Sequence, residues 1–270
     1  MDAAPASRSH LRTIAATLRG GLVAAYTAVS MPAFFLLQLP VMALTGSGDF
    51  SIWLARRAWG PMGLWLAGVR VEVVKLAPPP EGPAIFASNH ESILDPWALF
   101  MAIPRSLRFV AKSELFRIPI FGWYLRLARF VSVDRKNHTR AVAALKAAGQ
   151  VVRSGTSLIV FPEGTRSVDG WVHAFKKGPF VLAEEAQVPV VPVAVVGAAA
   201  LVRKGRMEVT PGTIRIAIGP AVLPSDHPDK NELLREVRRR VIAQHRALGG
   251  AGGRDEDVER AGFEGGRSVH

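Results

Sequence analysis

A histidine and an aspartate, His90 and Asp95, stand five residues apart in a polar stretch of the chain. An apolar run at 83–87 predicts a buried strand before the stretch, and a run at 97–101 predicts a helix after it. Five residues correspond to a rotation of roughly 140° on an ideal helix, so the two side chains can meet only if the segment is a turn. Asp95 precedes Pro96, as an N-cap residue precedes a proline at the first helical position.

Such a pair has a clear chemical use. A carboxylate that holds one imidazole nitrogen leaves the other nitrogen free to take a proton, which is the arrangement of a general base. His90 would be the base and Asp95 its orienting group. On this stretch alone a second interpretation stays open, in which Asp95 only caps its helix and His90 packs in the loop.

A second polar turn follows another apolar run. Residues 157–161 predict a buried strand, and residues 162–167, with Gly164 among them, predict a turn. Open α/β sheets bind ligands beyond the carboxyl ends of their strands. Both polar turns are therefore expected at one edge of a sheet.

The two turns resemble motifs of the glycerolipid acyltransferase family, in particular of the lysophosphatidate (1-acylglycerol-3-phosphate) acyltransferases. NHESILD at 89–95 matches the H-x-x-x-x-D motif of that family, and FPEGTRS at 161–167 matches its second motif without a change. Weaker blocks at 112–135 and 188–193 agree in order and spacing. The resemblance covers about residues 80 to 200.

The resemblance implies transfer of a fatty acyl group from a thioester, acyl-CoA or acyl-ACP, to the sn-2 hydroxyl of lysophosphatidic acid. The product would be phosphatidic acid, and no cofactor is expected beyond the acyl donor. The catalytic residues would be His90 and Asp95. The expected substrate-binding residues are Lys112, Arg135, Glu163, Gly164, Thr165 and Arg166.

Chemistry gives these residues different tasks. An arginine fork and backbone amides at a glycine-containing turn suit a phosphate, with Lys112 and Arg135 expected to converge from neighbouring strand ends. Glu163 cannot bind phosphate directly, so we expect it to pin the turn or to pair with Arg166, and a purely structural role stays open. Other acceptors are alternatives, namely another lysophospholipid, a lyso-ornithine lipid or glycerol-3-phosphate. A non-catalytic protein that binds anionic lipid on the same fold is a further alternative.

Composition favours a membrane over nucleic acid as the partner of this basic chain. The net charge is +12, while 49% of the 270 residues are hydrophobic and only two are tyrosines. We expect anionic membrane lipid and lysophosphatidic acid as partners, with acyl-carrier protein as a candidate donor and no nucleic acid. The chain has no cysteine, which excludes disulfides and acyl-cysteine intermediates, and no metal site is predicted.

The N-terminal part predicts a membrane anchor. No charged residue occurs from Gly20 to Gly48, and a second apolar segment at 50–69 carries three tryptophans and an arginine pair. We favour a two-helix membrane-embedded motif over a single span, and a buried pair of soluble helices remains an alternative. The expected location is the cell membrane, with the catalytic domain at its cytoplasmic face.

The chain therefore divides into a basic flank and two-helix anchor at 1–70, an α/β acyltransferase domain at 71–248, and a disordered tail at 249–270. The α/β domain should hold a mixed, mostly parallel central sheet flanked by helices. A hairpin is predicted at 207–218, and a last helix at 229–248 is predicted to carry a solvated basic face.

Overall fold

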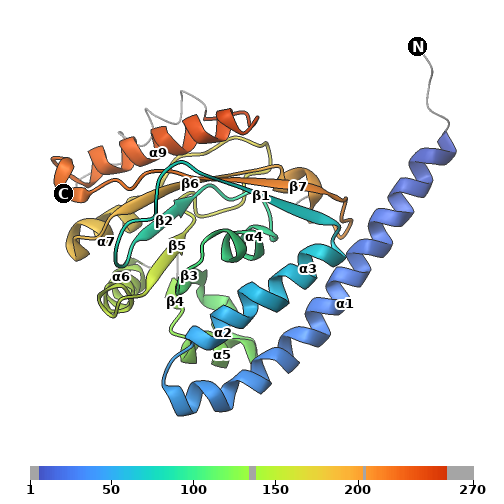
Figure 1. Cartoon of the computed structure of the whole chain (residues 1–270), viewed down its shortest axis with the longest axis horizontal. Coiled ribbons are helices and arrows are strands. Elements are labelled where there is room, and N and C mark those ends of the chain that lie inside the picture. The colour runs from blue at the N-terminus through green and yellow to red at the C-terminus, as the bar shows by residue number, and fades with distance from the viewer. Residues whose placement is uncertain (1–5, 134–137, 203–204, 254–270) are drawn as a thin grey trace.

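A seven-stranded mixed sheet forms the centre of the protein in a computed structural model that describes residues 6–133, 138–202 and 205–253 (Figure 1). The strand order is β1-β7-β6-β2-β5-β3-β4. The five strands from β6 to β4 run parallel to one another, while β7 pairs antiparallel with β6 and parallel with β1. The strands are β1 Val69–Lys75, β2 Ile85–Ser88, β3 Leu107–Lys112, β4 Val131–Val133, β5 Ser157–Val160, β6 Val190–Val196 and β7 Gly212–Ile218. The predicted mixed, mostly parallel sheet is confirmed.

Helices cover both faces of this sheet (Figure 1). One core cluster joins it to α4 and to the N-terminal helices, and the other joins it to α6, α7 and α9. Because both faces are covered, every residue of β6 is buried, as its β-branched composition predicts. The helices are α1 Ala6–Thr45, α2 Asp49–Leu54, η1 Ala55–Trp59, α3 Gly60–Leu66, α4 Asp95–Ala102, η2 Ser113–Arg117, α5 Phe121–Leu127, α6 His138–Arg153, α7 Gly178–Ala186, α8 Ala198–Leu201, η3 Pro224–Asp226 and α9 Lys230–Ala247.

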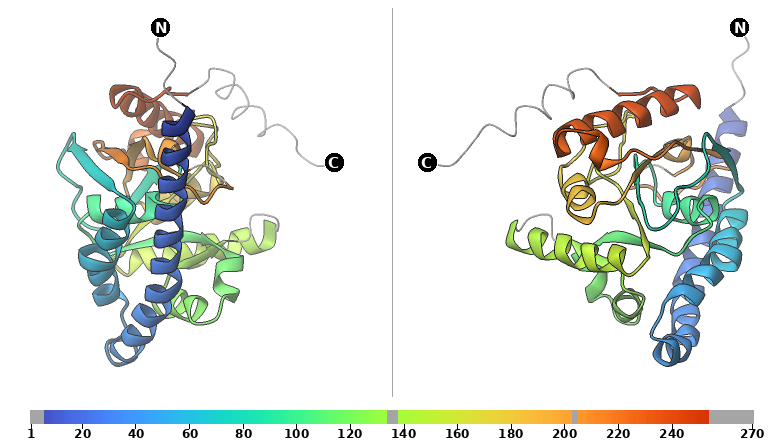
Figure 2. Two further views of the ribbon diagram at one scale, coloured as in Figure 1. Left: turned by 90° about the vertical axis from the view of Figure 1, so that its right-hand side faces the viewer. Right: turned by 60° about the vertical axis from the view of Figure 1, so that its left-hand side comes forward.

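The N-terminal region folds as two antiparallel helices. The long helix α1 continues through Pro32 and Pro40, and the chain then returns alongside it as α2, η1 and α3, which form one continuous helix with a π turn (Figure 2). The stretch His10–Thr45 has the length and apolar composition of a membrane-crossing helix, and little of its most apolar part is buried. Aromatic rings of Tyr26 and Trp59 stack between the two helices, and both contact Trp97 of α4.

The predicted hairpin at 207–218 is wrong. Only Gly212–Ile218 forms a strand, and the preceding residues bind to α1 instead of to that strand. The Val209 N–H donates to the carbonyl of Ala16 at 3.0 Å, and the Arg19 guanidinium donates to the carbonyl of Val209. Helix α1 supplies hydrogen-bond partners for this segment, and local strand propensity alone could not predict such long-range bonds.

The predicted domain boundaries also shift at both ends. Strand β1 begins at Val69, two residues before the predicted start of the α/β domain. At the C-terminus, residues 249–253 are ordered rather than part of a disordered tail, because the Val172 N–H donates to the carbonyl of Gly252 at 2.7 Å and Val172 bridges to Gly253. The rest of the predicted tail lies outside the described residues.

The docking of α1 on the segment around Met207 can be tested with two adjacent glycines. A Cβ at Gly20 would lie 1.7 Å from the Met207 carbonyl oxygen, whereas a Cβ at Gly21 would meet nothing within 4 Å. Gly20→Ala should lower the free energy of unfolding by about 1–3 kcal/mol because the backbone must move apart. Gly21→Ala should raise it by about 0.5–1 kcal/mol through helix propensity. Thermal unfolding in detergent would measure both, and equal effects would show that the segment does not dock on α1.

Candidate active site

The turn after β2 brings the predicted histidine and aspartate together. His90 Nδ1 lies 2.7 Å from Asp95 Oδ2, which also accepts the N–H groups of Glu91 at 2.7 Å and Ser92 at 2.9 Å. Asp95 is the first residue of α4, and Leu94 occupies the N-cap position. The expectation that Asp95 caps its own helix is therefore wrong: its carboxylate closes the turn that precedes the helix.

The electrostatics of the pair favour one tautomer of the imidazole. Asp95 is fully buried, and this burial raises the pKa of its carboxyl above the ordinary value, although the bonds from His90, Ser92 and Glu91 oppose the rise. Because Oδ2 accepts, Nδ1 of His90 carries the hydrogen and Nε2 presents its lone pair. The ring stacks on Phe161 with centroids 4.0 Å apart, and it is partly exposed to a cavity. Nε2 has no partner among the residues that the structure describes.

Glu163 ties the two polar turns together from a buried position. Its Oε1 accepts the His90 N–H at 2.9 Å, and its Oε2 accepts the His173 N–H at 3.3 Å. A second hydrogen bond between the two turns runs from the Ser167 N–H to the His90 carbonyl, at 2.7 Å. Burial raises the pKa of Glu163 to about 8. Glu163 thus pins the second turn to the first, and no ion pair joins it to Arg166 within the described part of the chain.

The second turn presents its other predicted residues to the cavity that His90 faces. Gly164 adopts φ +78°, a left-handed conformation that glycine favours and that closes the turn after Phe161. Gly164, Thr165 and Arg166 line this cavity together with Lys112 from the end of β3. Lys112 Nζ lies 2.9 Å from Glu114 Oε1 on an exposed surface. Arg135, the remaining predicted residue, lies outside the described residues.

The cavity has a volume of about 820 Å³, and its charged and polar lining residues are His90, Lys112, Glu114, Thr165 and Arg166. Beyond His90 its walls are aromatic and aliphatic side chains, drawn from α1, η1, α4, β3 and α5. These wall residues include Met31, Phe35, Trp59, Trp97, Phe100, Phe109, Phe121, Leu125 and Phe130. The site therefore offers a base and cations beside a long apolar space.

Two residues inside the first motif hold the turn to the rest of the fold, and the sequence did not single them out. The Asn89 amide donates to the Val195 carbonyl at 2.8 Å and accepts the Val195 N–H at 2.7 Å, which fixes the end of β2 to β6. Glu91 is buried, and its Oε2 accepts the N–H of Ala199 at 3.1 Å. Both side chains satisfy backbone groups that no strand partner reaches.

The last helix supports the site through two buried residues, His245, for which no role was predicted, and Arg238. His245 is buried, accepts the Gly252 N–H on Nδ1 at 3.0 Å, and approaches Glu91 Oε1 with Nε2 at 3.2 Å. Arg238, assigned to a solvated basic face, is also buried and donates to the carbonyls of Val172 and His173. Helical spacing from Leu234 and Val241 would have placed both residues on the buried stripe of α9.

The fold and this site define an α/β protein with a histidine–aspartate pair at a strand end, beside a largely apolar cavity lined by Arg166 and Lys112. A family model described as Acyltransferase matches residues 70–196. A solved structure of a 1-acyl-sn-glycerophosphate acyltransferase from Thermotoga maritima superposes with a TM-score of 0.71 at 27% identity, covering 97% of this chain and 99% of that one. Residues 70–196 therefore form an acyltransferase-family domain.

Curated relatives carry the same kind of name. A 1-acyl-sn-glycerol-3-phosphate acyltransferase of Chlamydomonas reinhardtii is 34% identical over 62% of this chain and 49% of its own length. One from Pseudomonas aeruginosa is 35% identical over 64% of this chain and 64% of its own length. The chain spans about half the length of several curated relatives that it matches, among them the algal protein and a chloroplastic one of Arabidopsis thaliana.

The link from α9 to the first motif predicts a positioning role for His245. His245→Ala removes the partner of buried Glu91 Oε1, so the turn that carries His90 should shift and acyl-transfer turnover should fall roughly ten- to hundredfold. His245→Gln retains a donor toward Glu91 and should recover part of the turnover. His227→Ala, a histidine outside this network, is the matched control. Turnover and circular dichroism would be compared, and full activity of a folded His245→Ala protein would contradict the role.

Proposed function

We propose that this protein transfers a fatty acyl group from an acyl thioester to the sn-2 hydroxyl of lysophosphatidic acid, giving phosphatidic acid. The observation that carries the proposal is the shared cavity, because His90 and Arg166 both line one largely apolar space of about 820 Å³. A lipid alcohol with a phosphate headgroup has a charged group that suits the cations of this cavity and an apolar chain that suits its apolar walls. The names of the relatives support the same acceptor.

The chemistry requires one base and no covalent enzyme intermediate. Nε2 of His90 takes the proton of the lipid hydroxyl as its oxygen attacks the thioester carbonyl carbon. The tetrahedral intermediate then collapses, the carbon–sulfur bond breaks, and the imidazolium returns its proton to the departing thiolate. Asp95, 2.7 Å from Nδ1, orients the ring and stabilises the imidazolium between the two proton transfers.

The cationic end of the cavity suits the acceptor phosphate. The Arg166 guanidinium can form a bidentate contact with phosphate oxygens, and Lys112, which is paired with Glu114, lines the same cavity. Gly164 and Thr165 line the same cavity, and the Gly164 N–H holds the turn in shape by donating to the Phe161 carbonyl at 3.0 Å. Glu163 is buried behind the turn, where it holds the turn's geometry without facing the phosphate.

The apolar end suits an acyl chain and meets the N-terminal helices. Met31 and Phe35 of α1 and Trp59 of η1 form part of the wall, so a chain in the cavity would lie next to the helices that we propose to be embedded in one leaflet of the cell membrane. The catalytic domain would stand at the cytoplasmic face, where acyl-CoA or acyl-ACP supplies the acyl group. No further cofactor is needed, because the thioester is already activated.

Removal of the proposed base is the direct test of the chemistry. His90→Ala should reduce turnover by at least about a hundredfold with little change in thermal stability, because the side chain is partly exposed and its loss leaves the backbone bonds of the turn in place. His173→Ala is the matched control, since this histidine does not line the cavity. Turnover would be followed with a labelled acyl thioester. Near-normal turnover of His90→Ala would remove the assigned base.

The acceptor can be identified by comparing headgroups. Arg166→Ala should raise the KM for lysophosphatidic acid roughly ten- to hundredfold, as expected for a lost charge-assisted bond, with a smaller change in kcat. Lysophosphatidylcholine, lyso-ornithine lipid and glycerol-3-phosphate would be assayed beside it, with Arg239→Ala on the surface of α9 as the control. If lyso-ornithine lipid, which has no phosphate, is the best acceptor, the proposed substrate is wrong. An unchanged KM for lysophosphatidic acid would place the phosphate elsewhere.

A further inference from the structure

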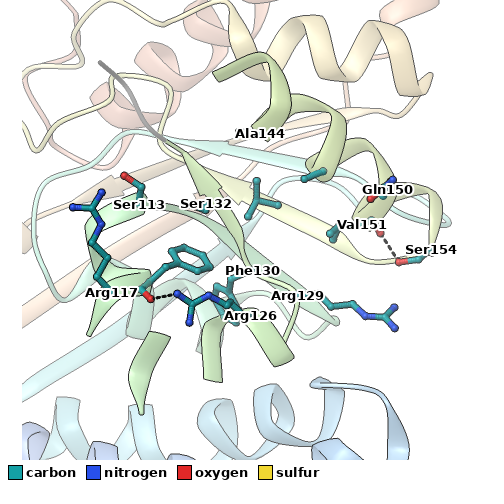
Figure 3. A pocket seen from close by; sticks show the side chains of 13 residues that line it. Ser113, Arg117, Arg126, Arg129, Phe130, Ser132, Ala144, Gln150, Val151 and Ser154 are labelled. Carbon is teal, nitrogen blue, oxygen red and sulfur yellow. Dashed lines mark hydrogen bonds between the residues drawn. The ribbon is translucent and has the colours of Figure 1, made fainter. Parts of the chain in front are cut away.

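A second hollow lies along the outer edge of the sheet, outside the catalytic cavity. It has a volume of about 780 Å³ and runs beside the edge strand β4, between the η2–α5 segment and α6 (Figure 3). Phe130 lines both this edge groove and the catalytic cavity, so its ring forms part of the wall between them. The polar and charged residues of the edge groove are Ser113, Arg117, Arg126, Arg129, Ser132, Gln150 and Ser154.

The edge groove is cationic and carries no balancing carboxylate. Arg117, Arg126 and Arg129 line it, and no aspartate or glutamate does so among the residues that the structure describes. In Figure 3 Arg117 extends at one end beside Ser113, Arg129 extends at the other end beneath Ser154, and Arg126 lies between them. Arg126 donates to the Phe116 carbonyl, which fixes its guanidinium in place. Hydroxyl and amide groups on the α6 side supply further hydrogen bonds.

The backbone at Arg129 gives an independent reason to regard this groove as a binding site. Helix α5 ends in a Schellman motif, in which the Phe130 N–H donates to the Leu125 carbonyl at 2.8 Å and the Arg129 N–H donates to the Arg126 carbonyl at 3.0 Å. Such a motif places its next-to-last residue in the left-handed region, where glycine is the relaxed choice. Arg129 adopts φ +60° there. Gln187 adopts the same conformation after α7, so the backbone only marks Arg129 as a candidate, and its place in the cationic lining of the groove supports the assignment.

The surroundings of the edge groove indicate a lipid rather than a soluble anion. Ile118, Trp123 and Leu127, on the same η2–α5 segment, are exposed apolar side chains. Helix α5 packs directly on α1, where Phe35 stacks on Phe121 with centroids 5.3 Å apart. The segment therefore adjoins the apolar N-terminal helix, and arginines next to exposed tryptophan and leucine match the headgroup level of a bilayer.

We propose that the edge groove binds the phosphate of an anionic phospholipid headgroup, at a site separate from the one where acyl transfer occurs. The phosphate would lie near Arg126 and Arg129, Arg117 at the other end of the groove would add to its positive potential, and the acyl chains would lie along the apolar residues of η2–α5. This site would hold the catalytic domain against anionic membrane regions and does not depend on the identity of the acyl acceptor.

The test uses full-length protein in neutral detergent and measures thermal unfolding against added lipid. Dihexanoyl-phosphatidylglycerol should raise Tm more than dihexanoyl-phosphatidylcholine or inorganic phosphate does, because only the first combines a net negative headgroup with acyl chains. Arg129→Gly should leave Tm without lipid unchanged or higher, since it relaxes the left-handed residue. The same variant should weaken the response to phosphatidylglycerol roughly tenfold in lipid concentration.

Two controls separate this site from its alternatives. Gln187→Gly relaxes another left-handed residue, at φ 52° after α7 and away from the edge groove, and should keep the full lipid response. Arg166→Ala should also keep it, because that arginine belongs to the catalytic cavity. An unchanged response in Arg129→Gly, or loss of the response in Arg166→Ala alone, would overturn the proposal. An equal response to phosphatidylcholine or to inorganic phosphate would overturn its assignment to an anionic lipid.

Discussion

The site depends on one residue being held from three directions. His90 donates its backbone N–H to Glu163, accepts at its carbonyl from the Ser167 N–H, and places its ring on the Asp95 carboxylate. The first two bonds come from the turn after β5 and the third from the start of α4. Because β2 and β5 are adjacent parallel strands, their carboxyl ends deliver the two turns side by side. Sheet topology thus sets the distance between the base and the cations that face the same cavity.

The buried carboxylates of the site accept most of their hydrogen bonds from backbone N–H groups, while Asp95 Oδ1 is buried without a partner among the described residues. Asp95 accepts two such bonds and Glu163 accepts two, while Glu91 accepts one and meets His245. A buried carboxylate left without donors would be costly, and pairing it with an arginine would neutralise a charge that the cavity needs. The arrangement therefore rigidifies both turns while Arg166 remains at the cavity wall, available to a ligand. The buried carboxylates therefore bind backbone N–H groups, and the Arg166 guanidinium is not needed to satisfy them.

Patterns in the sequence predicted the elements and the motifs well, but not the long-range contacts. Apolar runs located β2, β5 and β6, and the five-residue spacing of His90 and Asp95 predicted a turn that the structure contains. Predictions from local sequence patterns were wrong where contacts with a distant segment determine the structure. The residues before β7 bind α1, and Asp95 accepts N–H groups of its own turn although its position before proline is typical of an N-cap. Arg238 was wrongly assigned to a solvated face, and His245 was missed, because a dense run of arginines obscures the buried stripe of α9.

Residues from both predicted segments, the anchor and the catalytic domain, line the catalytic cavity. The wall of the catalytic cavity includes Met31 and Phe35 of α1 and Trp59 of η1, and these belong to the segment predicted as anchor. Phe35 also stacks on Tyr124 of α5 with centroids 3.9 Å apart, so the same ring contributes to both a cavity wall and an interhelical core. Removal of residues 1–70 would open the apolar end of the cavity to solvent and expose this core. In the proposed function, the apolar helix that would bind the bilayer also encloses the space for the acyl chain, so packing alone would link membrane contact to catalysis.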